Sequence, residues 1–108
     1  MRRSLGEALK TEQGITSILE NMHYLKSAAY NGDMSAVAII ADIETALEAT
    51  KISDRQRKAY ELVMLVGMTR QEAADIMQIS QQAVSRLIRT LSKNVAYYFS
   101  EVRGAKRT

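Results

Sequence analysis

Apolar side chains recur at intervals of three and four residues along most of this 108-residue chain, and no proline interrupts them. That spacing places the apolar side chains on one face of a helix, and a chain without proline can form long helices without a break. Valine, isoleucine, phenylalanine and tyrosine do not alternate with polar residues over any long run, so the two-residue period of strands is missing. The sequence therefore predicts an all-α fold.

Turn and capping residues divide the N-terminal half into two main helices. We expect one helix over residues 11–29 and a second over residues 34–49, and residues 3–10 allow a further short helix. The Asn31-Gly32-Asp33 turn between the two main helices ends the first and starts the second. Because this turn is short, the two helices should form an antiparallel hairpin, which we take as an N-terminal domain over residues 1–50.

The C-terminal half, residues 51–108, shows three further helices. We expect them over residues 54–66, over residues 69–77 and from about residue 80 to about residue 99, with Gly67 ending the first. Their predicted N-caps are Ser53, Thr69 and Ser80. The last helix is the longest of the three, and we expect its C-terminal part to pack on the hairpin or on a second copy, with Tyr98 and Phe99 inward. The residues expected to fill gaps in the core are Met22, Met34, Met64, Met68 and Met77.

Charge is distributed unequally between the two halves. Residues 1–50 contain four basic and seven acidic side chains, a net charge of −3, whereas residues 51–108 contain eleven basic and five acidic ones, a net charge of +6. The basic half could face a polyanion while the acidic half does something else, and an ordinary solvated basic surface is the alternative. The asymmetry indicates nucleic acid as one partner of the C-terminal half.

Several kinds of protein are disfavoured by what the chain lacks. It has no cysteine and one histidine, His23, so a zinc site of the usual kind is not expected. No glycine-rich phosphate loop and no nucleophile–base pair is present, so we expect neither an enzyme nor a bound cofactor. No apolar run approaches 18 residues and no signal peptide is recognisable, so we expect a cytoplasmic protein without a membrane span.

Residues 69–89, TRQEAADIMQISQQAVSRLIR, have the pattern of a helix-turn-helix. Two helices joined by a tight turn cross closely, which requires a small residue at the crossing, and Ala73-Ala74 supplies it. Ile79 is placed to fill the turn. The second helix returns apolar side chains to the crossing through Val84, Leu87 and Ile88. An ordinary helical hairpin would explain these apolar residues equally well.

The polar face of the second helix is what favours DNA over an ordinary hairpin, because it contains glutamine, serine and arginine but no acid. Glutamine can form two hydrogen bonds with adenine, arginine can do so with guanine, and long basic side chains also reach phosphates. The starts of both helices should lie near the DNA backbone. The predicted DNA-binding residues are Arg70, Gln71, Ser80, Gln81, Gln82, Ser85, Arg86, Arg89 and Lys93, and Arg55, Arg57 and Lys58 are candidates for contact with DNA or polymerase.

From Ile52 to about Phe99 the sequence resembles region 4 of bacterial RNA polymerase sigma factors. Three segments support the resemblance: SDRQR at residues 53–57, TRQEAA at residues 69–74 and ISQQAVSRLI at residues 79–88. The resemblance implies a domain whose last helix reads the −35 promoter element in duplex DNA and which also contacts the polymerase flap. One departure is Gln78, which stands where the family usually has a glycine in the turn, a left-handed position that other residues adopt at modest cost.

The chain has no room for the sigma domain that melts promoters and grips core polymerase, so we do not expect a complete sigma factor. Its plan, an acidic helical hairpin followed by a region 4-like domain, is similar to small transcription regulators encoded by phages and prophages. We therefore expect a promoter-binding regulator of this kind, acting as a homodimer on two half-sites. Two alternatives stay open: a co-sigma or appropriator protein that mainly binds RNA polymerase, and a small-terminase-like module that recognises DNA for packaging.

Overall fold

The computed structural model describes residues 11–103, and all regular structure in that range is helical. This confirms the all-α prediction; the short helix proposed for residues 3–10 lies outside the described residues. A π-helical segment directly continues α5 and another continues α7. The elements are α2 (Glu12–Glu20), α3 (Met22–Tyr30), α4 (Met34–Ala49), α5 (Asp54–Tyr60) with η1 (Glu61–Leu65), α6 (Arg70–Met77), and α7 (Gln81–Tyr97) with η2 (Tyr98–Arg103).

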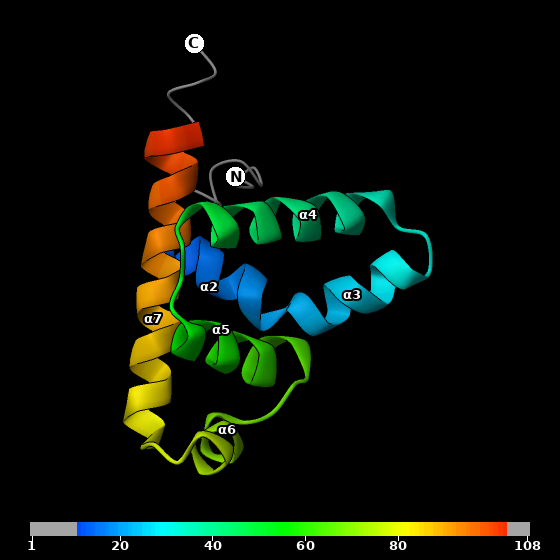
Figure 1. Ribbon diagram of the computed structural model, residues 1–108. Coiled ribbons are helices and arrows are strands. Elements are labelled where there is room, and N and C mark those ends of the chain that lie inside the picture. Colours follow the sequence, from blue (N-terminus) through cyan, green and yellow to red (C-terminus); the bar gives the residue numbers. More distant parts are fainter. Residues whose placement is uncertain (1–10, 104–108) are drawn as a thin grey trace.

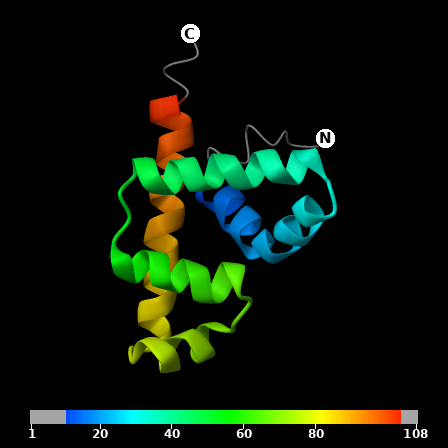
Figure 2. The same ribbon diagram turned by 45° about the vertical axis from the view of Figure 1, so that its right-hand side comes forward.

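The long helix α7 forms one side of the molecule, and the other helices extend from it in the same general direction (Figure 1). Helix α4 crosses α7 near the C-terminal end of α7, and α5 crosses α7 closer to its N-terminal end. Helix α6 lies beside the N-terminal end of α7 (Figure 2). Helices α3 and α4 pack side by side and are joined at the end far from α7, which confirms the predicted hairpin. Helix α2 packs against α7. None of the described helices is both long and apolar enough to cross a membrane.

The single helix predicted for residues 11–29 is wrong, because the chain breaks at Asn21 into α2 and α3. The backbone of Asn21 leaves helical geometry (φ −101°, ψ 8°), and its side-chain amide donates to the carbonyl oxygen of Ser17 at 2.8 Å. Asparagine side chains compete with helical hydrogen bonds in this way. The break lets α2 bury Ile15 and Leu19 and pack against α7 while α3 packs against α4.

The predicted start and stop signals of the C-terminal helices are confirmed. Ser53 and Thr69 each form a capping box, Ser53 with Gln56 and Thr69 with Glu72. Ser80 caps α7 through a hydrogen bond from Ala83 N to its Oγ at 3.0 Å. Gly32 and Gly67, each expected to follow the end of a helix, both adopt the left-handed conformation (φ 95° and 93°), which strains other residues. These local signals fix where the helices on either side of them begin and end.

One continuous apolar core joins the two halves of the chain. It includes Ile43 and Leu47 of α4 together with Leu91 and Val95 of α7. Phe99 is buried as predicted, and Tyr98 is half-buried and meets the Phe99 ring edge-on at 5.2 Å between centroids. The prediction that Met34 fills the core is wrong. That side chain is 73% exposed because it begins α4 at the outer end of the hairpin, beyond the reach of the core.

Candidate nucleic-acid interface

Helices α6 and α7 form the helix-turn-helix that the sequence predicts. Ala73 and Ala74 are buried where the two helices meet, and Val84 of α7 is fully buried. In the turn, Gln78 adopts the left-handed conformation (φ 59°, ψ 43°), and Ile79 N donates to Ala74 O at 3.1 Å. This is the hydrogen bond by which a left-handed residue ends a helix abruptly. Gln78 therefore takes, with a Cβ, the left-handed geometry expected at this turn position.

The side of α7 that faces away from the core bears a row of polar and basic side chains, which we call the basic ridge: Gln82, Arg86, Arg89 and Lys93. All four are exposed, and they follow one another at helical spacings of four, three and four residues. Among the described residues, none of the three cations takes part in an ion pair. The side chains of Gln81, Gln82, Ser85, Arg86 and Arg89 line one open hollow of about 350 Å³. The ridge is thus uncovered and free of carboxylates.

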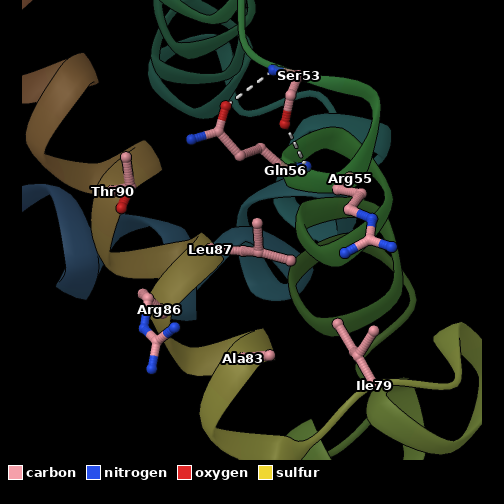
Figure 3. A pocket seen from close by; sticks show the side chains of 8 residues that line it. All are labelled: Ser53, Arg55, Gln56, Ile79, Ala83, Arg86, Leu87 and Thr90. Carbon is pink, nitrogen blue, oxygen red and sulfur yellow. Dashed lines mark hydrogen bonds between the residues drawn. The ribbon is translucent and has the colours of Figure 1, made fainter.

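On one flank of the ridge, between α7 and the start of α5, lies a depression of about 440 Å³ that we call the α5 hollow (Figure 3). Arg55 and Arg86 stand on opposite sides of it, with Leu87 between them. Gln56 accepts a hydrogen bond from Ser53 N at 2.8 Å through its amide oxygen, which leaves its amide nitrogen on the side toward α7. No carboxylate is among the residues that line the α5 hollow, so its charge is positive.

On the other flank of the ridge, α2 lies beside α7. The two helices border a depression of about 250 Å³, which we call the α2 hollow. Arg70, predicted to bind DNA, is half-buried here, and its Nη2 lies 3.8 Å from Oε2 of Glu20 on α2. Its Nε is buried and has no hydrogen-bond partner within residues 11–103. The residues lining the α2 hollow are Glu12, Thr16, Arg70, Ser85, Ile88 and Arg89. The structure therefore places Arg70 beside the ridge but already paired with a carboxylate.

Four other predicted residues lie off the ridge. Ser80 is exposed at the start of α7, where its hydroxyl accepts the capping hydrogen bond. Gln71 is exposed and donates to Asp75 Oδ1 at 3.0 Å. Arg57 pairs with Glu44 at 3.8 Å, which directs it toward α4. Lys58 is exposed on α5 but does not line either hollow. Of the three α5 cations considered, the structure brings only Arg55 next to the reading helix.

The prediction from sequence missed polar residues on both flanks. Thr90 lies one turn after Arg86 on the same face of α7, so helical spacing was a sufficient signal for it. For Gln56, the sequence indicates only a role as capping partner of Ser53, and it gives no sign that Gln56 lines the α5 hollow. Glu12 and Thr16 lie about seventy residues from the reading helix, and no local pattern in the sequence pairs α2 with α7. Among the described residues, no cluster of three or more potential metal ligands occurs.

These features together define a helix-turn-helix domain of the DNA-binding type, with one exposed basic face. Comparison with known families agrees: residues 43–90 match the family described as Sigma-70, region 4. This confirms the resemblance inferred from the three sequence segments, and the matched segment runs from the middle of α4 through Thr90 of α7. No curated protein and no solved structure matches the chain significantly.

Proposed function

We propose that this protein is a sequence-specific DNA-binding regulator of transcription that inserts the first part of the basic ridge, Gln82, Arg86 and Arg89, into the major groove. The observation that supports it best is that Arg86 and Arg89 are exposed and unpaired on the second helix of a helix-turn-helix. Arginine pairs with the guanine edge and glutamine with the adenine edge, so Gln82 adds a second type of base contact. Catalysis and a cofactor have no part in this proposal.

The residues of the ridge contact different parts of the DNA, because they lie at different positions along α7. Lys93 lies seven residues after Arg86, which is about 10 Å along a helix axis. That distance carries Lys93 out of the groove and toward the sugar–phosphate backbone. The α5 hollow supplies a second backbone contact, because Arg55 is a cation and the Gln56 amide nitrogen is a donor on the same flank. Phosphate contacts of this kind set the register of a protein on the duplex, while base contacts select the sequence.

The test is the double substitution Arg86→Ala/Arg89→Ala, measured by fluorescence anisotropy against sites selected from random duplex DNA. Each arginine–guanine pair contributes at least about 1 kcal/mol, so affinity should fall by roughly thirtyfold or more. The matched control is Lys26→Ala/Lys51→Ala, which removes the same charge from exposed positions on α3 and after α4. Unchanged affinity in the arginine variant, with circular dichroism showing a folded protein, would refute the assignment of this face.

A second candidate is direct binding to RNA polymerase. It is favoured by the match of residues 43–90 to sigma-70 region 4, a domain of a polymerase subunit. The exposed side chain that suits such a contact without touching the ridge is Lys58 on α5. A pull-down with bacterial core polymerase in DNA-free buffer separates the two candidates, because a pure DNA-binding protein would not be retained.

We also propose that the protein acts as a homodimer. A single reading helix gives modest affinity, and two copies double the contacts across adjacent half-sites. The hairpin offers apolar surface for this contact, since Tyr30 is 92% exposed, Met34 73% and Val37 40%. Sedimentation at micromolar concentration should show a dimer that Val37→Glu weakens. A wild-type protein that sediments only as a monomer, free and on DNA, would rule this out.

The setting that we propose is the cytoplasm of a bacterial cell, with the gene belonging to a phage or prophage. The support is the plan of the chain, in which an acidic helical hairpin precedes a region 4-like domain. In that setting the promoter would be one of the phage's own. Chromatin immunoprecipitation from the host after induction tests this, and enrichment spread evenly over host promoters would contradict it.

A further inference from the structure

One face of α2 presents two carboxylates toward Arg70 and Arg89. Glu12, Thr16 and Glu20 follow one another at intervals of four residues and therefore share one face of α2. Glu12 and Thr16 line the α2 hollow together with Arg89 of the ridge, and Glu20 pairs with Arg70. We call Glu12 and Glu20 the acidic stripe. Helix α2 lies outside the segment that matches sigma-70 region 4, so the stripe is an addition to that domain.

The pairing of Arg70 with Glu20 is poorly explained by stability alone. Both side chains are partly exposed, 34% for Arg70 and 52% for Glu20, and at 3.8 Å the contact is long. Ion pairs of this kind add little to folding stability. Moreover, Arg70 Nε is buried and finds no hydrogen-bond partner in the part of the chain that the structure describes, which is unfavourable. The contact with Glu20 instead holds the guanidinium of Arg70, at the start of α6, against α2, so that it does not extend toward solvent.

The two flanks of the ridge therefore differ in charge. The α5 hollow contains Arg55 and Arg86 without a carboxylate, whereas the α2 hollow contains Arg70 and Arg89 together with Glu12. A backbone phosphate entering the α2 hollow would lie beside Glu12, at a separation shorter than the Debye length of about 8 Å, so salt would screen the repulsion little. It also finds Arg70 already engaged.

We infer that the acidic stripe of α2 is an electrostatic barrier that limits DNA backbone contact on its flank of the ridge. Glu20 withholds Arg70 from phosphate, and Glu12 opposes the phosphate that Arg89 would otherwise reach. The duplex is consequently gripped on the α5 flank, and the affinity for DNA is lower than the arginines alone would give. This inference rests on the proposed function, because it concerns how the same surface meets DNA.

The test is to neutralise the stripe by Glu12→Gln, Glu20→Gln and both together, and to measure duplex affinity over a range of salt concentrations. The double variant should bind about five- to tenfold more tightly at low salt. The slope of log affinity against log salt should become steeper by about one, because one more phosphate is neutralised. Glu48→Gln is the matched control: it makes the same charge change at an exposed position of α4 and should shift affinity less than twofold.

A double-mutant cycle identifies Arg70 as the released cation. Arg70→Gln should remove the gain in slope when it is added to Glu20→Gln, because the released cation is then absent. Thermal unfolding checks that each variant is folded. Glu12→Gln, which breaks no ion pair among the described residues, tests the barrier should Glu20→Gln unfold. Unchanged or weaker binding by the stripe variants, with a wild type that binds duplex DNA, overturns this inference alone. If neither the wild type nor any variant binds duplex DNA, the proposed function is overturned as well. If the double variant binds and the wild type does not, the result supports the barrier.

Discussion

The hydroxyl of Tyr60 on α5 donates a hydrogen bond to Oε2 of Glu44 on α4 at 3.2 Å. The other oxygen of the same carboxylate lies 3.8 Å from Nη1 of Arg57. Glu44 thus joins the hairpin to the first helix of the C-terminal half through two side chains. Tyr60 is 1% exposed, and its burial, reinforced by the adjacent Glu44 carboxylate, raises the pKa of its hydroxyl above the usual range.

Tyr60→Phe should lower the free energy of unfolding by about 1 kcal/mol, since it removes this hydrogen bond and leaves the ring in place. Urea denaturation at pH 7 measures the change. Tyr24→Phe is the control, because Tyr24 is 74% exposed and its hydroxyl should contribute nothing measurable. Equal stability of Tyr60→Phe and wild type would mean that the Tyr60–Glu44 contact does not hold the two helices together.

The raised pKa of Tyr60 predicts a loss of stability in base. The unfolded chain releases this proton near the ordinary pKa of 10.0, whereas the folded protein retains it to higher pH. The stabilising contribution is therefore complete below pH 10.0 and declines as pH rises above it, by up to about 1.4 kcal/mol per pH unit. Denaturation curves of wild type and Tyr60→Phe at several pH values isolate this component. Parallel pH dependences in the two proteins would exclude it.

Ser92→Ala should stabilise the protein. Ser92 is fully buried on α7, and its Oγ has no hydrogen-bond partner in the described part of the chain. Removing an unpaired buried hydroxyl relieves a desolvation cost, and alanine is also the better helix former, so we expect a gain of about 1 kcal/mol. Thermal melting measures it, with Ser27→Ala on the exposed face of α3 as the reference for helix propensity alone. A lower melting temperature for Ser92→Ala than for wild type would contradict the prediction.

Gln78→Gly should also raise stability, by about 0.5 to 1 kcal/mol. Gln78 holds the left-handed conformation (φ 59°) in the turn between α6 and α7, which costs a residue with a Cβ more than it costs glycine. Gln78→Val should be destabilising, because a β-branched side chain fits that conformation worst. Chemical denaturation of both variants checks the order, and a Gly variant no more stable than the Val variant would count against strain at this turn.

Lys93→Ala should weaken binding to all duplex sequences to a similar extent. Its place at the far end of the ridge assigns it to phosphate rather than to a base, so the loss should be independent of sequence. The slope of log affinity against log salt should also become shallower by about one. Titrations on selected and scrambled sites measure both effects, with Lys26→Ala as the control. A loss confined to the selected site would assign Lys93 to base recognition instead.

Local signals in the sequence were sufficient for most of the helix-turn-helix. The caps Ser53, Thr69 and Ser80 and the left-handed turn positions are properties of a few neighbouring residues, so they could be predicted without knowledge of the rest of the fold. The same holds for the basic ridge, because helical spacing alone places Arg86, Arg89 and Lys93 on one face. The break at Asn21 was missed because apolar spacing continues through it, and a single side-chain hydrogen bond interrupts the helix.

The sequence by itself determined which residues form helices and which side of α7 is polar, because both follow from interactions within about one helical turn. Only the tertiary structure decided what lies beside that polar side. Packing of α2 against α7 brings Glu12 and Glu20 to one flank, and packing of α5 brings Arg55 to the other. Apolar burial drives these contacts between segments far apart in the chain. It is non-directional, so no spacing of residues encodes which helix meets which.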